Sequence, residues 1–366
     1  MMLLAVAVSA VSCQWRDLDY EFIDTARITI IYNWEQSGLR TKANNAAVNQ
    51  GDFINGRTAA FYPMNGGDPV IKMSHSDTVT VNLLVGQYAA VFFNETFDDF
   101  DNIRFTGTES FDLLEAWAKD DIVATTRANS TIARQPDILA VESMVPFEVT
   151  EDMVRYTRIV ETRKSKGTKN GEFKSDDDWR SVEEAMTVET RPRSVVKKVV
   201  IDVNVEGLDN VAVAGGYVSG FAGGYDFSLG RQNSTSVSHK ITFTDQEFLP
   251  DSDTDGVLRS EFQCFGYRDG ISVNLSGYTF DFRAVLVNGE VYQEQRDIDE
   301  LITEVEEDGS IVLHITIGTH KGGTGSGDDE DAPIKVPEVE RVGGDGMWLV
   351  NVGDWDEIVV PIDMNM

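Results

Sequence analysis

The sequence has few of the residues that build disulfide frameworks, metal sites and histidine-based active sites. It contains two cysteines, Cys13 and Cys264, and four histidines in 366 residues. Two cysteines are too few for a disulfide framework or a four-thiolate zinc site. The four histidines leave little material for histidine-based catalysis. The composition therefore favours an exported or highly soluble binding protein over an enzyme.

Positive charge is also scarce. The 31 Lys and Arg residues are outnumbered by 62 Asp and Glu residues, which gives a net charge of −31. Contacts with nucleic-acid phosphates and adsorption to an anionic bilayer both require cations. We therefore expect no nucleic-acid partner and no peripheral adsorption to an anionic membrane. The hydrophobic fraction of 41% still suffices for sizeable cores, and the length suits two domains.

Long apolar runs are absent apart from the first twelve residues. Residues 1–12 are apolar and small, and the chain turns polar directly after Cys13. Such a run matches the core of a signal peptide but falls short of the ~20 residues that span a bilayer. Ala10-Val11-Ser12-Cys13 resembles a bacterial lipobox, which implies lipidation of Cys13, although Ala10 replaces the usual leucine and no Lys or Arg precedes the run. The alternative is an ordinary signal peptide with an incidental cysteine.

Alternating apolar residues predict many short strands. Gly86-Gln87 predicts a hairpin turn between the strand 77–85 and the apolar run 88–93, and Asn288-Gly289 predicts a type I′ hairpin turn. Two short amphipathic helices are expected at 110–118 and 298–305. The other clear strand patterns lie at 26–32, 199–205, 278–286, 311–317 and 358–364.

This pattern predicts an all-β protein built as two antiparallel sandwiches with short helical insertions. The expected division is a signal peptide at 1–12, an N-terminal sandwich at 13–185 and a C-terminal sandwich at 186–366. The charge-rich stretch near 151–180 is expected to be a solvated insertion in the first sandwich.

One segment has the opening of a calcium-binding loop. Asp251, Asp253 and Asp255 alternate before Gly256, but the twelfth position, which should be a bidentate glutamate, is Phe262. A polar turn is the favoured interpretation, and these aspartates remain a weak metal candidate. Cys264 is expected to be a buried small hydrophobic residue, and His314 is expected to point away from the apolar face of its strand.

Several segments, in their order along the chain, resemble a known family. The most telling are Asn102–Phe111 (NIRFTGTESF) and Asp354–Glu357 (DWDE), with Gly215–Gly224 between them. This order is similar to the fimbrillin-like outer-membrane lipoproteins of Bacteroidales, many of them known only as domains of unknown function. The resemblance implies two transthyretin-like Greek-key sandwiches and a non-catalytic surface role as pilus subunit, pilus anchor or adhesin, without cofactors.

The same resemblance implies partners and modifications. The lipid on Cys13 would attach the protein to the outer membrane. Donor-strand exchange would join it to other fimbrial subunits, and adhesion would bind it to host or microbial surface ligands. In shaft subunits an arginine-specific protease removes the N-terminal strand, for which Arg16, Arg27 and Arg40 are candidates. Thr25 and Thr78 lie in Asp-Thr-apolar triplets that resemble Bacteroidales O-glycosylation sites.

Three other functions remain open from the sequence. The first is a carbohydrate-binding surface lipoprotein, in which tryptophans would act as stacking platforms. The second is a calcium-dependent adhesion module, and the third a hydrolase whose cleft gathers carboxylates distant in sequence. The candidate platforms are Trp15, Trp34, Trp117, Trp179, Trp348 and Trp355.

Overall fold

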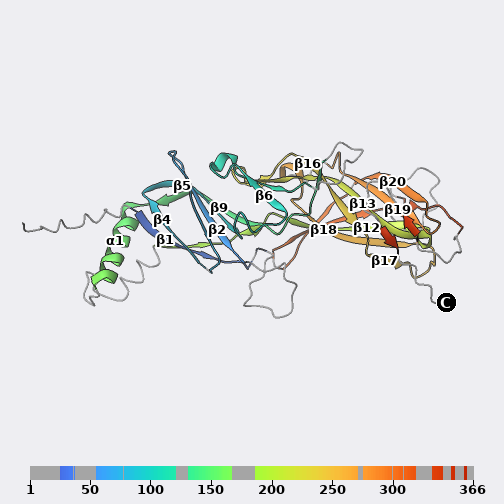
Figure 1. Ribbon diagram of the computed structural model, residues 1–366, viewed down its shortest axis with the longest axis horizontal. Coiled ribbons are helices and arrows are strands. Elements are labelled where there is room, and N and C mark those ends of the chain that lie inside the picture. Colours follow the sequence, from blue (N-terminus) through green and yellow to red (C-terminus); the bar gives the residue numbers. More distant parts are fainter. Residues whose placement is uncertain are drawn as a thin grey trace, which may run out of the picture.

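The protein is mostly β-structure, arranged as an elongated body (Figure 1). The α-helix α1 lies at one end beside β1 and β4, and β17, β19 and β20 lie toward the other end. The computed structural model describes residues 25–35, 37, 55–76, 78–120, 131–166, 186–270, 275–298, 300–307, 309–318, 332–340, 348–350 and 358–360.

The N-terminal part is a sandwich of a three-stranded and a five-stranded sheet. The strand orders are β10-β1-β4 and β11-β9-β5-β2-β3. Ile28 and Val81 of the smaller sheet pack with Phe61 and Phe92 of the larger one, all 2% exposed or less. The strands are β1 (Thr25–Tyr32), β2 (Arg57–Pro63), β3 (Val70–Ser74), β4 (Thr78–Leu84), β5 (Gly86–Asn94), β9 (Ala140–Val149), β10 (Thr187–Thr190) and β11 (Arg193–Ser194).

The two strands β2 and β5 of the five-stranded sheet are buried on both faces. Phe92 faces the core shared with β1, whereas Phe93 faces a second core that includes Ala116 and Phe227. Burial on both faces explains why residues 88–93 form a continuous apolar run instead of an alternating one. The second core is closed by a four-stranded sheet of β6 (Ile103–Thr106), β7 (Glu115–Ala118), β14 (Gly224–Asp226) and β15 (Arg231–Gln232).

The C-terminal part is a second sandwich. Its aromatic core contains Phe221, Phe262 and Phe280. The sheets run β17-β18-β12-β22-β21, with β23 beside β12, and β20-β19-β13-β16-β8. The strands are β8 (Thr131–Ala133), β12 (Lys197–Glu206), β13 (Val211–Ala222), β16 (Ser236–Thr242), β17 (Asp245–Phe248), β18 (Gly256–Cys264), β19 (Thr279–Leu286), β20 (Val291–Asp297), β21 (Ile302–Val305), β22 (Ile311–Ile317) and β23 (Ile334–Lys335).

Strands from both halves of the sequence share sheets. β7 pairs with β14, β8 pairs in parallel with β16, and β11 pairs with β9. Each of these three pairings joins a strand before residue 185 to a strand after it. The predicted division at 185/186 remains a prediction. A further two-stranded sheet joins β24 (Trp348–Val350) to β25 (Ile358–Val360), the latter within the strand predicted at 358–364.

The predicted hairpin between 77–85 and 88–93 is wrong. β4 pairs with β1, whereas β5 pairs with β2 and β9. The two strands face each other across the N-terminal core, since β4 buries one face and β5 buries both. The turn at Gly86 therefore carries the chain from one sheet to the other.

Both predicted amphipathic helices are also wrong. Residues Phe111–Leu113 form a 3-10 turn, η2, and Ala116 and Ala118 of β7 alternate into the second core. Residues Ile302–Val305 form β21, which pairs with β22. In both places pairing with a neighbouring strand overrides the local helical spacing.

The charged insertion contains an α-helix, α1 (Glu151–Lys166). Val154 of α1 is 6% exposed and Thr157 is 2% exposed, three residues apart and therefore on one face of the helix. The segment is thus not wholly solvated, because this face covers part of the N-terminal core.

The hairpin predicted at Asn288-Gly289 is confirmed, since β19 pairs with β20, but the predicted type I′ turn is wrong, because only Gly289 of this pair has a positive φ. Two further predictions, on Cys264 and His314, are confirmed. Cys264 is fully buried, and burial raises the pKa of its thiol to about 12. His314 points outward, with its Nε2 atom 3.2 Å from Glu304.

His239 of β16 is a buried titratable group whose charging should destabilise the fold. Its ring centroid lies 6.4 Å from that of Phe221 and 5.6 Å from that of Phe262. Burial lowers its pKa to about 4. The unfolded chain therefore takes up a proton at His239 more readily than the folded chain does. The contribution of the neutral, buried ring to the free energy of unfolding is complete above about pH 6.5 and is lost as the pH falls toward 4. Over that interval it amounts to about 3 kcal/mol.

We expect His239→Leu to flatten the decline of unfolding free energy between pH 7 and pH 4.5, measured by urea unfolding. His75→Gln serves as the control, because the His75 side chain is 67% exposed. An unchanged slope in His239→Leu would contradict this assignment. Carboxylates titrate over the same interval, so the difference between variant and parent is the quantity to compare.

Candidate functional site

β1 is the central strand of the three-stranded sheet. β4 pairs with it in antiparallel fashion from Thr25 to Ile31, and β10 pairs with it in parallel from Thr29 to Tyr32. Its inward side chains all belong to the N-terminal core. They are Ala26, Ile28, Ile30 and Tyr32, with exposed fractions of 0%, 1%, 0% and 8%.

Tyr32 fixes the carboxyl end of β1. Its ring stacks on Trp34 with centroids 5.2 Å apart and meets the edge of Phe92 at 6.3 Å. Its hydroxyl donates a hydrogen bond of 2.8 Å to the carbonyl of Thr58 on β2. Burial raises the pKa of Tyr32 well above its usual value, so this hydroxyl stays protonated. The end of β1 is therefore attached to the opposite sheet.

The helix α1 secures the other end of β1. The amide of Thr29 donates to Met186 at the start of β10, at 2.9 Å. Two residues earlier the amide of Arg27 points to the same side of the strand, where it donates to Oγ1 of Thr157 at 2.8 Å. That hydroxyl in turn donates to the carbonyl of Met153 at 3.0 Å. The helix thus covers the edge of β1 at the residues that precede its pairing with β10.

This geometry makes β1 replaceable in principle by another strand. β4 and β10 lie on opposite sides of β1 and each presents backbone hydrogen-bonding groups toward it. A segment with small or branched apolar residues at alternate positions would satisfy the same groups. In this structure the position between β4 and β10 holds the chain's own strand.

The predicted modification and cleavage residues are only partly described. Cys13, Arg16 and Arg40 lie outside the described residues. Arg27 lies within β1, opposite Asn82 of β4. Thr78 is exposed at the start of β4, and Thr25 is half-buried at the start of β1, so both stay predictions as glycosylation sites.

The loop at Asp251, Asp253 and Asp255 is a hydrogen-bonded turn. Oδ1 of Asp255 accepts from the amide of Gly207 at 3.1 Å, while Asp251 and Asp253 are exposed. Phe262, at the twelfth position of the motif, is 2% exposed in the core and cannot act as a ligand. In the parts of the chain described, no three His, Cys, Asp or Glu side chains are grouped to hold a metal ion.

The described tryptophans offer no exposed planar cluster. Trp34 is 7% exposed, and Trp117 is half-buried with the guanidinium of Arg104 6.0 Å from its ring centroid. The side chains of the other candidate platforms, Trp15, Trp179, Trp348 and Trp355, lie outside the described residues.

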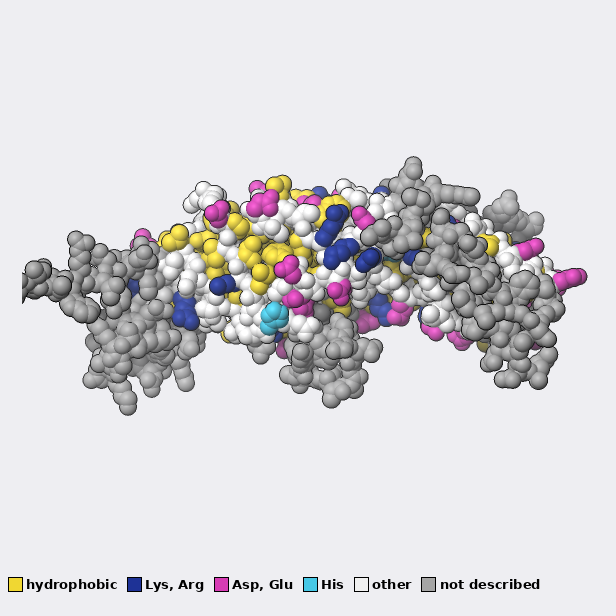
Figure 2. Space-filling view, viewed as in Figure 1, with side chains coloured by type: hydrophobic (Ala, Val, Ile, Leu, Met, Phe, Trp, Pro, Cys, Tyr) yellow, Lys and Arg dark blue, Asp and Glu magenta, His cyan; other side chains and the backbone are white. Residues whose placement is uncertain are grey.

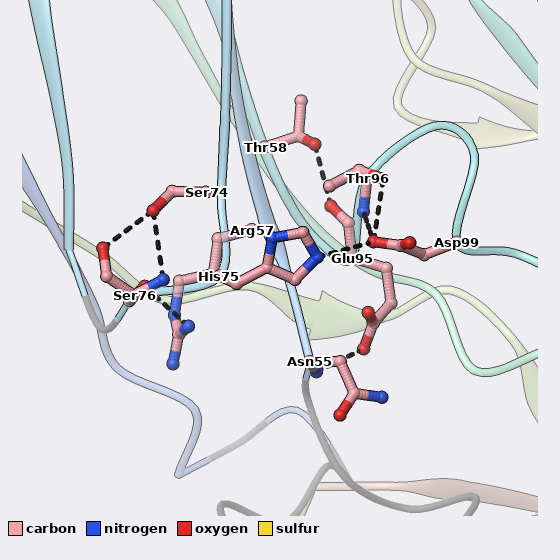
Figure 3. A network of polar contacts seen from close by, with 9 residues as sticks. All are labelled: Asn55, Arg57, Thr58, Ser74, His75, Ser76, Glu95, Thr96 and Asp99. Carbon is pink, nitrogen blue, oxygen red and sulfur yellow. Dashed lines mark hydrogen bonds and ion pairs between the residues drawn. The ribbon is translucent and has the colours of Figure 1, made fainter.

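A polar network joins the end of β3 to β2 and to the turn after β5 (Figure 3). Oδ2 of Asp99 lies 3.5 Å from Nε2 of His75 and accepts from the hydroxyl of Thr96 at 2.8 Å. Glu95 has a positive φ of 60°, and its carboxylate accepts from the amide of Asn55 at 2.7 Å. Burial is the main cause that raises the pKa of Glu95.

The network contains the residue types of a hydrolase site but uses them differently. The hydroxyls of Ser74 and Ser76 lie 2.7 Å from each other, and Ser76 also donates to the carbonyl of Thr78. The guanidinium of Arg57 donates to the carbonyl of Ser76 at 2.7 Å. The serines in Figure 3 point away from His75. The network is accounted for by its role in fastening two turns to β2.

No described helix is both long and apolar enough to cross a membrane.

The contact between α1 and β1 is not foreseen from the sequence, because 151–180 is charged overall. The spacing of Met153, Val154 and Thr157 is the signal that could have located it.

Comparisons with known proteins place this chain in a family. It belongs to the domain of unknown function family DUF5119, which matches residues 12–244. Its fold is similar to that of a candidate adhesin from Bacteroides ovatus ATCC 8483, with a TM-score of 0.55, 16% identity, and coverage of 93% of this chain and 99% of that one. Family membership and this shared fold confirm the resemblance drawn from the sequence. No curated protein matches.

Two fimbrial proteins of Porphyromonas gingivalis are weaker structural matches. The fimbrial anchor protein Mfa2 matches with a TM-score of 0.37 and 10% identity, covering 79% of this chain and 95% of that one. The tip fimbrial protein Mfa3 matches with a TM-score of 0.31 and 12% identity, covering 75% of this chain and 82% of that one.

Thr157→Val should loosen the hold of α1 on β1. Valine keeps the shape of threonine but removes the acceptor for the amide of Arg27, at a cost of about 1–3 kcal/mol. We expect trypsin to cleave after Arg27 faster in this variant than in the parent. The cleavage is measured from the mass of the shortened chain. Asp152→Asn is the matched control, since that side chain is 75% exposed on the same helix. Equal cleavage rates in the two variants would contradict the proposed role of Thr157.

Proposed function

We propose that the protein is a non-catalytic fimbrial surface component, tethered to the outer membrane through a lipid on Cys13, that keeps β1 as its own strand. The carrying observation is the position of β1 between β4 and β10, with α1 over its first residues. The similarity in fold to a candidate adhesin supports a surface role.

The energetics support a fold that requires a strand in this position. Burying a large apolar side chain contributes about 1.5–3 kcal/mol. Loss of Ile28, Ile30 and Tyr32 would therefore remove an amount comparable to the ~5–15 kcal/mol that typically keeps a domain folded. A subunit without β1 would need a strand from a neighbour, which is the physical basis of strand exchange.

Among the fimbrial roles, we favour the anchor. An arginine-specific protease needs an extended and accessible chain, whereas Arg27 lies in a paired strand with its amide bonded to Thr157. Cleavage after Arg27 would remove only the first three residues of β1 and would require α1 to move first. A chain left uncut between Cys13 and β1 keeps its first strand connected to the lipid.

Gel mobility of native cell-surface material tests the role in assembly. A shaft subunit joined by strand exchange gives a ladder in SDS that collapses on boiling. We expect no ladder of multiples of this protein, whether or not the sample is boiled. A ladder detected with an antibody against this chain would contradict the anchor role and indicate a shaft subunit.

The tether is tested by replacing the lipidated cysteine. We expect Cys13→Ala to abolish labelling by a fatty-acid analogue and to release the protein from the membrane fraction, because two or three acyl chains provide stable anchoring. Cys264→Ala is the control, since that thiol is fully buried and should not affect labelling. Unchanged membrane retention of Cys13→Ala would refute the tether.

A further inference from the structure

A hollow of about 430 Å³ opens between the turn that follows β2 and the 3-10 turn η2. Tyr62 and Met64 line it on one side and Glu109, Phe111 and Asp112 on the other, with Val145 of β9 contributing a further wall. It is separate from the position of β1, because Tyr62 points to the opposite face of β2 from Phe61.

One half of the hollow is apolar. The rings of Tyr62 and Phe111 lie with their centroids 6.1 Å apart and their planes tilted by 44°. Met64 is 53% exposed and Val145 49% exposed, so a ligand could contact both without displacing the core. In Figure 2 hydrophobic side chains gather on this face of the N-terminal half, with acidic side chains at their margin.

The other half is acidic. Glu109 and Asp112 are exposed, and no Lys, Arg or His is among the described residues that line the hollow. Neither carboxylate forms an ion pair with another described residue. Burial, and next the charge of Glu109, raises the pKa of Tyr62 to about 12, which places this carboxylate near the phenol.

A buried polar atom also points to a missing ligand. Tyr62 is only 5% exposed and its hydroxyl is inaccessible to solvent. This hydroxyl nevertheless has no hydrogen-bond partner among the described residues. Buried hydroxyls are normally hydrogen-bonded, because an unpaired one costs about 1–3 kcal/mol. A donor entering the hollow beside the Tyr62 ring would meet the two carboxylates, and it would reach the phenol oxygen only after the side chains that cover this atom move aside.

We propose that this hollow binds a protruding arginine or lysine side chain of a protein partner. The aliphatic stem of such a side chain would lie along Met64 and Val145, as long cationic side chains do on apolar surfaces. Its charged group would reach Glu109 and Asp112. The net charge of −31 would attract a cationic partner over longer range.

Other ligand classes fit this hollow less well. Phosphate, sulfate and acidic sugars would meet two carboxylates and no cation. A neutral sugar requires an open aromatic face for stacking, whereas Tyr62 is almost wholly covered and Phe111 is half-buried. The exposed methionine and valine are typical of a surface that receives the apolar part of a protein side chain.

Calorimetry and NMR titration of the full chain with Nα-acetyl-arginine amide and Nα-acetyl-lysine amide test the proposal. We expect weak, saturable binding that raised salt reduces. Glu109→Gln combined with Asp112→Asn should lower the affinity at least tenfold, while Glu307→Gln, in the turn after β21, should leave it unchanged. Because both replaced carboxylates are exposed, the variants should keep the parent's unfolding midpoint.

A neutral probe serves as the control, and three results would overturn the proposal. Nα-acetyl-norleucine amide, which has the stem without the charge, should not bind measurably. Absence of saturable binding by both cationic probes, equal binding to the double variant, or tighter binding of cellobiose than of the arginine probe would each overturn the proposal. None of these results depends on whether β1 is exchanged between subunits, so the two proposals can fail separately.

Discussion

The three-stranded sheet of the N-terminal sandwich depends on its middle strand, because β4 and β10 pair with β1 from opposite sides. The inward face of β1 fills the core against Phe61 and Phe92, and its ends are held by different elements. Tyr32 bonds to β2 across the core, whereas Arg27 bonds to α1. A single short strand thus contacts two edge strands, the opposite sheet and the helix.

The five-stranded sheet connects the N-terminal core to the rest of the molecule. β2 and β5 are buried on both faces, so alternate residues of the same strand belong to two cores. The second core is completed by β14, whose sequence lies in the C-terminal half, and β8 of the N-terminal half extends a sheet of the C-terminal sandwich. The two parts of the elongated body (Figure 1) are therefore joined by paired strands and a shared core rather than by a single linker.

Much of the secondary structure could be predicted, but its partners could not. Alternation in residues 26–32, 199–205 and 311–317 located β1, β12 and β22, because period-two burial leaves a direct trace in the sequence. The same alternation does not say which strand lies alongside, and so the sequence predicts a pairing of β4 with β5, whereas β4 pairs with β1. The hollow beside η2 was not predictable either. Its residues come from β2, η2 and β9, and only tertiary folding brings them together.

The position of β1 and the hollow beside η2 are distinct sites that share one strand. Phe61 of β2 faces β1, and the next residue, Tyr62, faces the hollow. Because protein interiors are close-packed, a shift of β2 on one face is transmitted to side chains on the other. The aromatic contacts of Phe61 with Tyr88, Phe92 and Phe147, all within 6.3 Å, resist such a shift while β1 is in place. The aromatic rings packed on Phe61 thus hold β2 on one face, while the next residue, Tyr62, lines the hollow on the other.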